Sequence, residues 1–172
     1  VMATRSGSVD PGLLLWLLEH EEMDTGELAD TLEHRSGLLG LAGSADMREV
    51  IERASADDGS DVAQHAQLAL DTYVHRLRAG IAAMAAALDG MDALVFTGGV
   101  GEHAAQVRER AAAGLGFLGV ALDGALNAAA QGDAEISAEG APVRALVVSA
   151  REDVEIARQV RALLSASRGP SG

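Results

Sequence analysis

The sequence contains no cysteine and no lysine, and the two absences exclude several kinds of chemistry. Without cysteine the chain has no thiol nucleophile, no disulfide and no thiolate metal site. All 13 basic residues are arginine, which excludes a Walker-type phosphate lysine, a Schiff-base lysine and a lysine general base. A chain without cysteine is compatible with the cytoplasm, and we expect a cytoplasmic location.

Aromatic residues and positive charge are also scarce. One Trp, one Tyr and two Phe offer few platforms on which nucleic-acid bases could stack. With 26 acidic residues and neutral histidines, the net charge of −13 repels a phosphate backbone and an anionic membrane surface. The longest apolar run, residues 13–18, is far shorter than the roughly 20 residues that span a bilayer. We therefore expect neither nucleic acid nor a membrane as a partner.

What is present is the composition of a folded domain. Of the 172 residues, 48% are hydrophobic and 23% are charged, which is typical of a soluble globular protein. A chain of this length buries roughly 70% of the surface that its unfolded form exposes, so a single domain over residues 1–172 is expected. The sequence starts at Val1 and its first predicted element only at Asp10, so we expect these residues to continue from an upstream segment.

Capping residues and the spacing of apolar residues predict a helical first half. Asp10 and Pro11 suit the N-cap and first position of a helix, and Ser44 suits the N-cap of a later one. Between them, the apolar and glycine-punctuated segment 36–43 is expected to be a loop. The predicted helices cover residues 11–19, 25–33, 44–53, 61–88, 102–113 and 152–165.

Short apolar runs in the second half predict strands, which are residues 92–97, 117–120, 134–137 and 143–149. The last helix is amphipathic, and residues 168–172 should form a frayed tail. The expected buried stripe of the helix at 152–165 consists of Val154, Ile156, Ala157, Val160, Leu163 and Leu164. Helices first, and then strands alternating with helices, indicate an α/β fold in which helices cover a sheet.

A glycine-rich turn follows the first predicted strand and consists of Gly98, Gly99, Val100, Gly101 and Glu102. In open α/β sheets, ligands lie beyond the carboxyl ends of the strands, and glycine lets a ligand approach the backbone N–H groups. The run is not a Walker A loop, because lysine is absent, and it lacks the third glycine of a dinucleotide fingerprint. These residues alone leave two interpretations open, a ligand site and a tight structural turn.

Other charged residues also have a chemical and a structural interpretation. Arg5 lies in a small-residue segment suited to bidentate phosphate or carboxylate contact, although chemistry alone favours an exposed arginine without a role. Glu152 and Asp153 could hold Mg²⁺ at a helix start, but complementing the helix dipole is the favoured explanation. Asp46 and Arg48 are similarly ambiguous. The histidines show no zinc-ligand spacing, and the G-x-S-x-G pattern of a nucleophile elbow is absent.

Several short motifs occur in a fixed order along the chain. They are Thr-Arg-Ser-Gly at 4–7 with Asp-Pro at 10–11, Ser-Gly-Leu-Leu-Gly at 36–40, Asp-Met-Arg at 46–48, Asp-Thr-Tyr-Val-His-Arg at 71–76, Val-Phe-Thr-Gly-Gly-Val-Gly-Glu at 95–102, Val-Arg-Glu-Arg at 107–110 and Leu-Gly-Phe-Leu-Gly at 115–119. As an ordered set they closely resemble the carboxy-terminal part of the acetate kinase family. The resemblance implies the ribonuclease-H-like fold of acetate and sugar kinases, Hsp70 and actin, a sheet flanked by helices.

The resemblance also implies an activity and a set of site residues. Acetate kinases reversibly transfer the γ-phosphoryl group of ATP to acetate with Mg²⁺, giving acetyl phosphate and ADP. Arg5 matches the family's active-site arginine, which neutralises charge on the transferring phosphoryl group, and Glu152 becomes the Mg²⁺ candidate. Residues matching the adenosine pocket and the nucleotide-binding glycine loop are Asp46, Met47 and Arg48, and Gly98, Gly99, Val100, Gly101 and Glu102.

The chain also departs from the family pattern. His103 stands where an Asn commonly follows the Gly-Glu pair, and Arg151 replaces the Asn before Glu152. The family's amino-terminal half, with its catalytic Asp, a second active-site Arg and a phosphate loop, does not occur in these residues, so we expect the chain alone to be inactive as a kinase. A nucleotide-binding or homodimerisation module without catalysis, a propionate or butyrate kinase, and a nicotinamide dehydrogenase remain alternatives.

Overall fold

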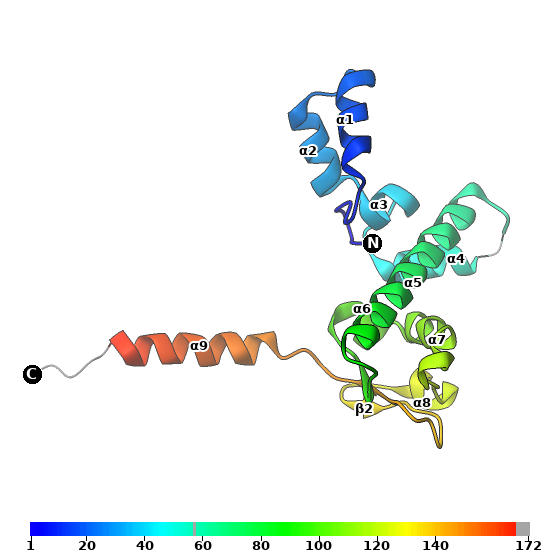
Figure 1. The fold of residues 1–172 in the computed structure, drawn as a ribbon, viewed down its shortest axis with the longest axis vertical. Coiled ribbons are helices and arrows are strands. Elements are labelled where there is room, and N and C mark those ends of the chain that lie inside the picture. Colours follow the sequence, from blue (N-terminus) through cyan, green and yellow to red (C-terminus); the bar gives the residue numbers. More distant parts are fainter. Residues whose placement is uncertain (57, 168–172) are drawn as a thin grey trace, which may run out of the picture.

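Helices make up the first half of the chain, and a small sheet lies in the second half (Figure 1). The computed structural model describes residues 1–56 and 58–167, so the predicted tail at 168–172 lies outside the described residues. The first-half elements are α1 (Pro11–His20), α2 (Thr25–His34), α3 (Gly37–Ala42), α4 (Met47–Ser55) and α5 (Asp61–Ala87). The second-half elements are β1 (Ala93–Phe96), α6 (Gly98–His103), α7 (Ala105–Ala113), the 3₁₀ turn η1 (Gly116–Leu118), α8 (Gly124–Ala129), β2 (Ala134–Glu135), β3 (Arg144–Val147) and α9 (Glu152–Ser167).

Local capping starts α1 and α5 where the sequence predicts them. The Asp10 carboxylate accepts the N–H of Gly12 at 2.7 Å, and Pro11 occupies the first helical position. At α5, the Ser60 hydroxyl accepts the N–H of Ala63 at 3.2 Å. Each contact satisfies one N–H group that the helix itself leaves unpaired, and both predicted helices are confirmed.

The segment 36–43 is a helix, α3, and the prediction of a loop is wrong. Backbone N–H groups at its start donate to carbonyl oxygens of the N-terminal segment at 2.8–3.0 Å, namely Ser36 to Thr4, Leu38 to Met2 and Leu39 to Ala3. Gly37 has a φ of +64°, and a Cβ there would lie 2.9 Å from the carbonyl oxygen of Arg5. Distant residues therefore cap α3, which a local sequence pattern cannot reveal.

The next helix, α4, has its N-cap at Asp46, and the prediction of Ser44 is wrong. Asp46 Oδ1 accepts the N–H of Arg48 at 2.9 Å. The Ser44 hydroxyl instead donates to Glu49 at 2.8 Å and accepts the N–H of Asp46 at 3.1 Å. Ser and Asp are both favoured at N-caps. Ser44 is not the N-cap here, because its hydroxyl is bonded to Glu49 and to the N–H of Asp46.

The sheet has the strand order β1-β3-β2, with β1 parallel and β2 antiparallel to β3. These strands confirm the predictions at 92–97, 134–137 and 143–149. The predicted strand at 117–120 is wrong, because η1 and a left-handed Gly119 with a φ of +88° turn the chain there. Within residues 117–120, Val120 alone forms an isolated bridge, to Val143. The short helix α8 is not predicted from the sequence.

Helix α5 connects the other helices of the first half to α7 through a shared core. Its buried face packs with α3, α4 and α7 in one hydrophobic cluster, composed of Leu38, Ala42, Met47, Val50, Ala66, Ala69, Leu70, Val74 and Val107. Val100 and Ala104 pack against this cluster from the α6 side. The starts of α4 and α6 therefore rest on the same core. Among the helices described here, none has both the length and the apolar character required to cross a bilayer.

Helix α9 extends away from the rest of the molecule (Figure 1). The predicted helix is confirmed, but its predicted buried stripe is wrong, because the side chains from 152 to 165 are all exposed. The periodicity correctly indicates an amphipathic helix, yet the described residues provide no surface that covers its apolar face.

Candidate functional site

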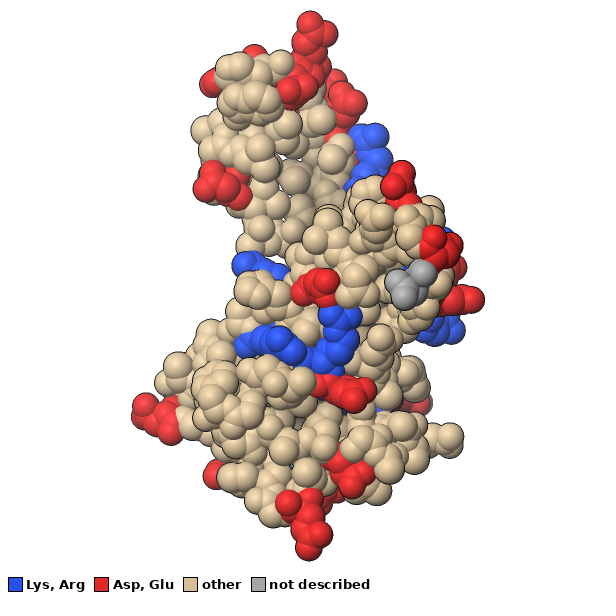
Figure 2. Space-filling view, turned by 90° about the vertical axis from the view of Figure 1, so that its right-hand side faces the viewer, with Lys and Arg blue, Asp and Glu red and all other residues tan. Residues whose placement is uncertain are grey.

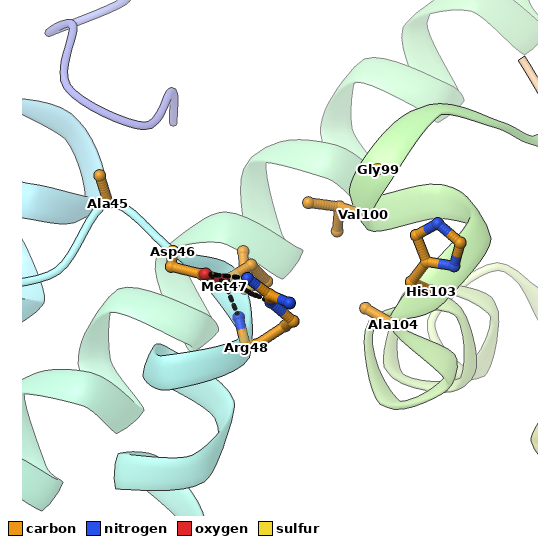
Figure 3. A pocket seen from close by; sticks show the side chains of 8 residues that line it. All are labelled: Ala45, Asp46, Met47, Arg48, Gly99, Val100, His103 and Ala104. Atoms are coloured by element: carbon orange, nitrogen blue, oxygen red, sulfur yellow. Dashed lines mark hydrogen bonds and ion pairs between the residues drawn. The ribbon is translucent and has the colours of Figure 1, made fainter.

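A cleft of about 710 Å³ lies between the start of α4 and helix α6 (Figure 3). One wall consists of Ala45, Asp46, Met47 and Arg48, and the other of Gly99, Val100, His103 and Ala104. The volume lies in the range of roughly 300–1,000 Å³ that is usual for small-molecule sites. The fold thus brings together residues from the two segments that the sequence singles out for a nucleotide.

The α4 wall carries an ion pair between Asp46 and Arg48. Arg48 Nη2 lies 2.6 Å from Asp46 Oδ2, and Nε donates to Oδ1 at 3.1 Å (Figure 3). Hydrogen bonds from the Arg48 side chain, and then from its backbone N–H, hold the pKa of Asp46 at about 2, below the ordinary 3.8. The Arg48 side chain is still 86% exposed. Asp46 therefore orients a guanidinium that remains accessible to an anionic or planar ligand.

The α6 wall is built from glycines with different roles. The predicted glycine break before a helix at Glu102 is wrong, because α6 itself begins at Gly98, whose φ is +72°. A Cβ on Gly99 would meet no atom within 4 Å, whereas one on Gly101 would lie 3.2 Å from the Phe96 backbone. Gly98 therefore allows the turn, Gly101 allows close packing on β1, and Gly99 leaves space at the cleft.

Glu102 lies outside the residues that line the cleft, and its carboxylate is engaged within the fold. Oε1 accepts the backbone N–H of Gly98 and that of Ala150, both at 2.9 Å. These two N–H groups follow the carboxyl ends of the parallel strands β1 and β3. The side chain of Glu102 therefore joins the two strand ends behind the glycine wall.

Arg5 is exposed and does not line this cleft. Its backbone is fixed on both sides, because Thr4 accepts the N–H of Ser36 and the N–H of Ser6 donates to the carbonyl oxygen of Leu32, each at 2.8 Å. The residues that follow, Ser6, Gly7 and Ser8, line a separate cavity of about 530 Å³ that also includes Arg35 and Arg76. The structure thus holds the Arg5 loop firmly but does not bring Arg5 into the cleft with Asp46 and Gly99.

Glu152 is the first residue of α9, and its side chain is exposed. It lies two residues after Ala150, whose N–H donates to the Glu102 carboxylate. In residues 1–56 and 58–167, no three His, Asp or Glu side chains form a cluster that could hold a metal. Mg²⁺ commonly uses one or two carboxylates together with substrate phosphates and water. Glu152 is therefore suited to a metal ion whose other ligands come from a bound phosphate and water. It is not suited to a metal centre in which protein side chains supply all the ligands.

The two departures from the family motifs have clear positions. His103 lines the cleft on the α6 wall (Figure 3). Arg151 pairs with Asp133 at 2.7 Å, away from the cleft lining. The histidine therefore alters the cleft itself, whereas the arginine is accommodated by a surface ion pair.

The sequence patterns assign no functional role to Arg108 or Asn127, which are both buried in the fold. One signal for Arg108 is present in the sequence. It shares helical spacing with Ala111, Ala112 and Leu115, which are all buried. A charged residue in such a stripe needs polar partners inside the protein.

Charge is unevenly distributed over the surface. On the face shown in Figure 2, basic side chains gather around the middle of the molecule, and acidic side chains lie beside them and toward both ends. A chain with a net charge of −13 can therefore still offer local positive charge to an anion.

Comparison with known sequences identifies the relatives of this chain. Residues 1–158 match the Acetokinase family. The acetate kinase of Gloeobacter violaceus is 49% identical over 160 residues, which are 92% of this chain and 38% of that protein. The acetate kinase of Streptomyces coelicolor is 47% identical over 172 residues, 99% of this chain and 41% of that protein. The chain therefore spans about two fifths of the length of these curated relatives.

Solved structures give the same fold. The crystal structure of Porphyromonas gingivalis acetate kinase matches with a TM-score of 0.84 and 35% identity, over 95% of this chain and 40% of that chain. A propionate kinase from Francisella tularensis matches with a TM-score of 0.81 and 33% identity, over 91% and 38% of the two chains. The ribonuclease-H-like fold expected from the sequence motifs is thereby confirmed.

Proposed function

The chain belongs to the acetokinase family, and from this membership we propose that residues 1–172 are one domain, the carboxy-terminal nucleotide-binding part of an acetate kinase. The enzyme would reversibly transfer the γ-phosphoryl group of ATP to acetate, giving acetyl phosphate and ADP. The observation that carries the proposal is the single cleft in which Asp46, Met47 and Arg48 face Gly99 and Val100.

In this proposal the cleft holds the adenosine part of the nucleotide. Met47, Val100 and Ala104 supply apolar surface for a flat base, and the Asp46–Arg48 pair supplies oriented polar groups. Gly99 allows the nucleotide to approach the backbone, because no side chain occupies that space. A mainly apolar cleft with a few oriented polar groups is the usual form of a small-molecule site.

Arg5 and Glu152 are proposed to act on the phosphates. The guanidinium of Arg5 would neutralise charge on the phosphoryl group during transfer, which is where most catalysis of this reaction arises. Glu152 would hold Mg²⁺ together with the nucleotide phosphates. Bound Mg²⁺ supplies neutralisation of the charge that develops on the phosphate oxygens.

We also propose a second copy of the chain as a partner and the cytoplasm as the location. The proposed dimer is supported by α1, which buries none of its residues and exposes Leu13, Leu15 and Trp16. Exposed apolar patches of this kind commonly mark association surfaces. A cytoplasmic location follows from the proposed use of ATP.

The direct test is nucleotide competition on the purified chain. In ligand-observed NMR, ADP and ATP with Mg²⁺ should displace each other. In spectra of the protein, both should shift the amide signals of Gly99 and Val100. NAD should neither displace these nucleotides nor shift the amide signals. Binding of NAD without ADP would instead support the dehydrogenase alternative. We expect no acetyl phosphate from the chain alone, because the family's catalytic Asp and second active-site Arg do not occur in these residues.

A propionate kinase is the second candidate, favoured by the structural match to the Francisella tularensis propionate kinase. The two candidates share the nucleotide and differ in the acyl acceptor. Rates with acetate and with propionate, measured on a whole enzyme that includes this chain, distinguish them.

A further inference from the structure

Arg108 is a buried guanidinium that is paired with neutral oxygens. Only 1% of the residue is exposed, and burial lowers its pKa from the ordinary value. Nε donates to Asn127 Oδ1 at 2.7 Å, and Nη2 donates to the carbonyl oxygen of Asn127 at 2.7 Å. Nη1 donates to the carbonyl oxygens of Gly101 at 2.9 Å and Glu102 at 2.8 Å. An arginine remains protonated in proteins, so these carbonyl groups solvate a buried positive charge.

These hydrogen bonds join three helices. Gly101 and Glu102 lie in the last turn of α6, whose carbonyl groups have no partner within the helix. Arg108 lies on α7, and Asn127 on α8 donates a further hydrogen bond from Nδ2 to the carbonyl oxygen of Ala105 at 3.0 Å. The Arg108–Asn127 pair therefore fixes the end of α6 against α7 and α8.

Helix α6 has little intrinsic stability of its own. It has six residues, three of which are Gly98, Gly99 and Gly101, and its N-cap Thr97 makes no side-chain capping bond. Glycine is among the least favourable residues within a helix. The Glu102 carboxylate holds its beginning through the N–H of Gly98, and Arg108 holds its end. The position of the α6 wall of the cleft therefore depends on side chains that face away from the ligand space.

We propose that Arg108, held by Asn127, is a positioning residue that fixes the glycine wall of α6 and thereby sets the affinity of the cleft for an adenine nucleotide. The inference rests on the proposed function, because it takes the ligand from it. Arg108 touches the α6 backbone and not the cleft, so its effect on binding is transmitted through α6.

The experiment compares two variants with a matched control. Arg108→Lys retains the charge and loses the planar fork that reaches four carbonyl oxygens. Asn127→Ala removes the side-chain partner and keeps Arg108, so it decides the outcome if Arg108→Lys does not fold. Arg110→Lys is the control, because it is the same substitution on the same helix, and Arg110 pairs with Asp71 away from α6. Affinity for ADP with Mg²⁺ and amide hydrogen exchange are measured for each chain.

The expected pattern is local. Arg108→Lys should weaken ADP binding about tenfold or more, and Asn127→Ala should weaken it by a smaller factor. Hydrogen exchange of the α6 amides should accelerate by a factor similar to the loss of ADP affinity, and exchange of the β3 amides should stay unchanged. Saturating ADP should restore the protection of the α6 amides. The Arg110→Lys control should match the unaltered chain in every measurement.

Other patterns overturn the inference. If ADP affinity is unchanged in both variants, or if α6 and β3 amides accelerate together, Arg108 serves only general stability. If the unaltered chain itself binds no ADP while Arg108→Lys still loosens α6 alone, the proposed function fails, and the positioning of a nucleotide site fails with it. If the unaltered chain binds ADP and both variants bind it with the same affinity, the inference is rejected. The proposed function is unaffected by that result.

Discussion

At the scale of single residues, the space left by the missing side chain of Gly99 is as important to the cleft as the contacts of the other residues that line it. Gly99 contributes no side chain, and a Cβ there would meet nothing within 4 Å. Its φ lies outside the left-handed region, unlike that of Gly98 at +72°. Gly99 is therefore dispensable for folding, and its value lies in the space that it leaves for a ligand.

We predict that Gly99→Val weakens ADP binding about tenfold or more, since the added atoms occupy ligand space, and changes the melting temperature little. Gly101→Ala is the contrasting variant, because its Cβ would press on the Phe96 backbone at 3.2 Å and should lower the melting temperature. Calorimetric titration and thermal melts measure both effects. Unchanged ADP affinity in Gly99→Val would show that the nucleotide lies elsewhere.

The Asp46–Arg48 pair gives the α4 wall a specific pH dependence. The pKa of Asp46 is lowered to about 2 in the fold, from an ordinary 3.8, mainly by the Arg48 side chain. A lowered carboxyl pKa contributes stability that is fully present above the ordinary value and is lost as the pH falls through the folded value. The window of loss therefore lies between pH 3.8 and about 2.

We predict that the Asp46 carboxyl signal titrates with a midpoint near 2 in an NMR pH series. In Arg48→Ala the midpoint should move toward 3.8, because the largest cause of the shift is removed. A midpoint near 3.8 in both chains would mean that the pair does not persist in solution.

At the scale of elements, α5 and α9 show how the same helical periodicity leads to different burial. Both helices carry apolar residues at helical spacing. In α5 one face is covered by α3, α4 and α7, whereas the side chains of α9 from 152 to 165 are all exposed. Most of the stability of a helix in a protein comes from packing, so the two helices should respond differently to the same substitution.

We predict that Leu70→Ala in α5 lowers the free energy of unfolding by about 2–5 kcal/mol, since the lost side chain is fully buried. Leu163→Ala in α9 is the matched change, and at 71% exposure it should stay within about 0.5 kcal/mol. Urea unfolding of the two variants provides the comparison. A loss above about 1 kcal/mol for Leu163→Ala would indicate that α9 is covered in solution.

At the scale of the whole molecule, apolar side chains remain exposed at opposite parts of the fold. Leu13, Leu15 and Trp16 are exposed on α1, and several aliphatic residues are exposed along α9. Trp16 is the one tryptophan of the chain, and its ring stacks on His20 with the centroids 5.0 Å apart. Its fluorescence therefore reports directly on the α1 surface.

We predict that the chain forms dimers at micromolar concentration and that Trp16 emission shifts to shorter wavelength as they form, because association removes water from the α1 surface. Leu15→Glu should return the chain to monomers without loss of stability, since Leu15 is 60% exposed. Sedimentation velocity and emission spectra test both points. A chain that stays monomeric at roughly tens of micromolar contradicts the proposed dimer.

The candidate site was predictable in part. The motifs led to Asp46, Met47, Arg48, Gly99 and Val100, and the structure brings all five to one cleft. The motifs could not show that Glu102 turns away from the cleft, because its partner Ala150 comes from another strand end. Nor could they show the role of Arg108, whose partners lie on two other helices.

Features that depend only on neighbouring residues could be predicted from the sequence. The N-caps of α1 and α5, the periodicity of α5 and the apolar strands are local properties, and the ordered motifs carry the family membership. The folded chain alone reveals that α3 is a helix, that α6 begins at Gly98 and that the side chains of α9 from 152 to 165 are exposed. The physical reason is that caps and periodicity act over a few residues, whereas burial and hydrogen-bond partners come from segments that only folding brings together.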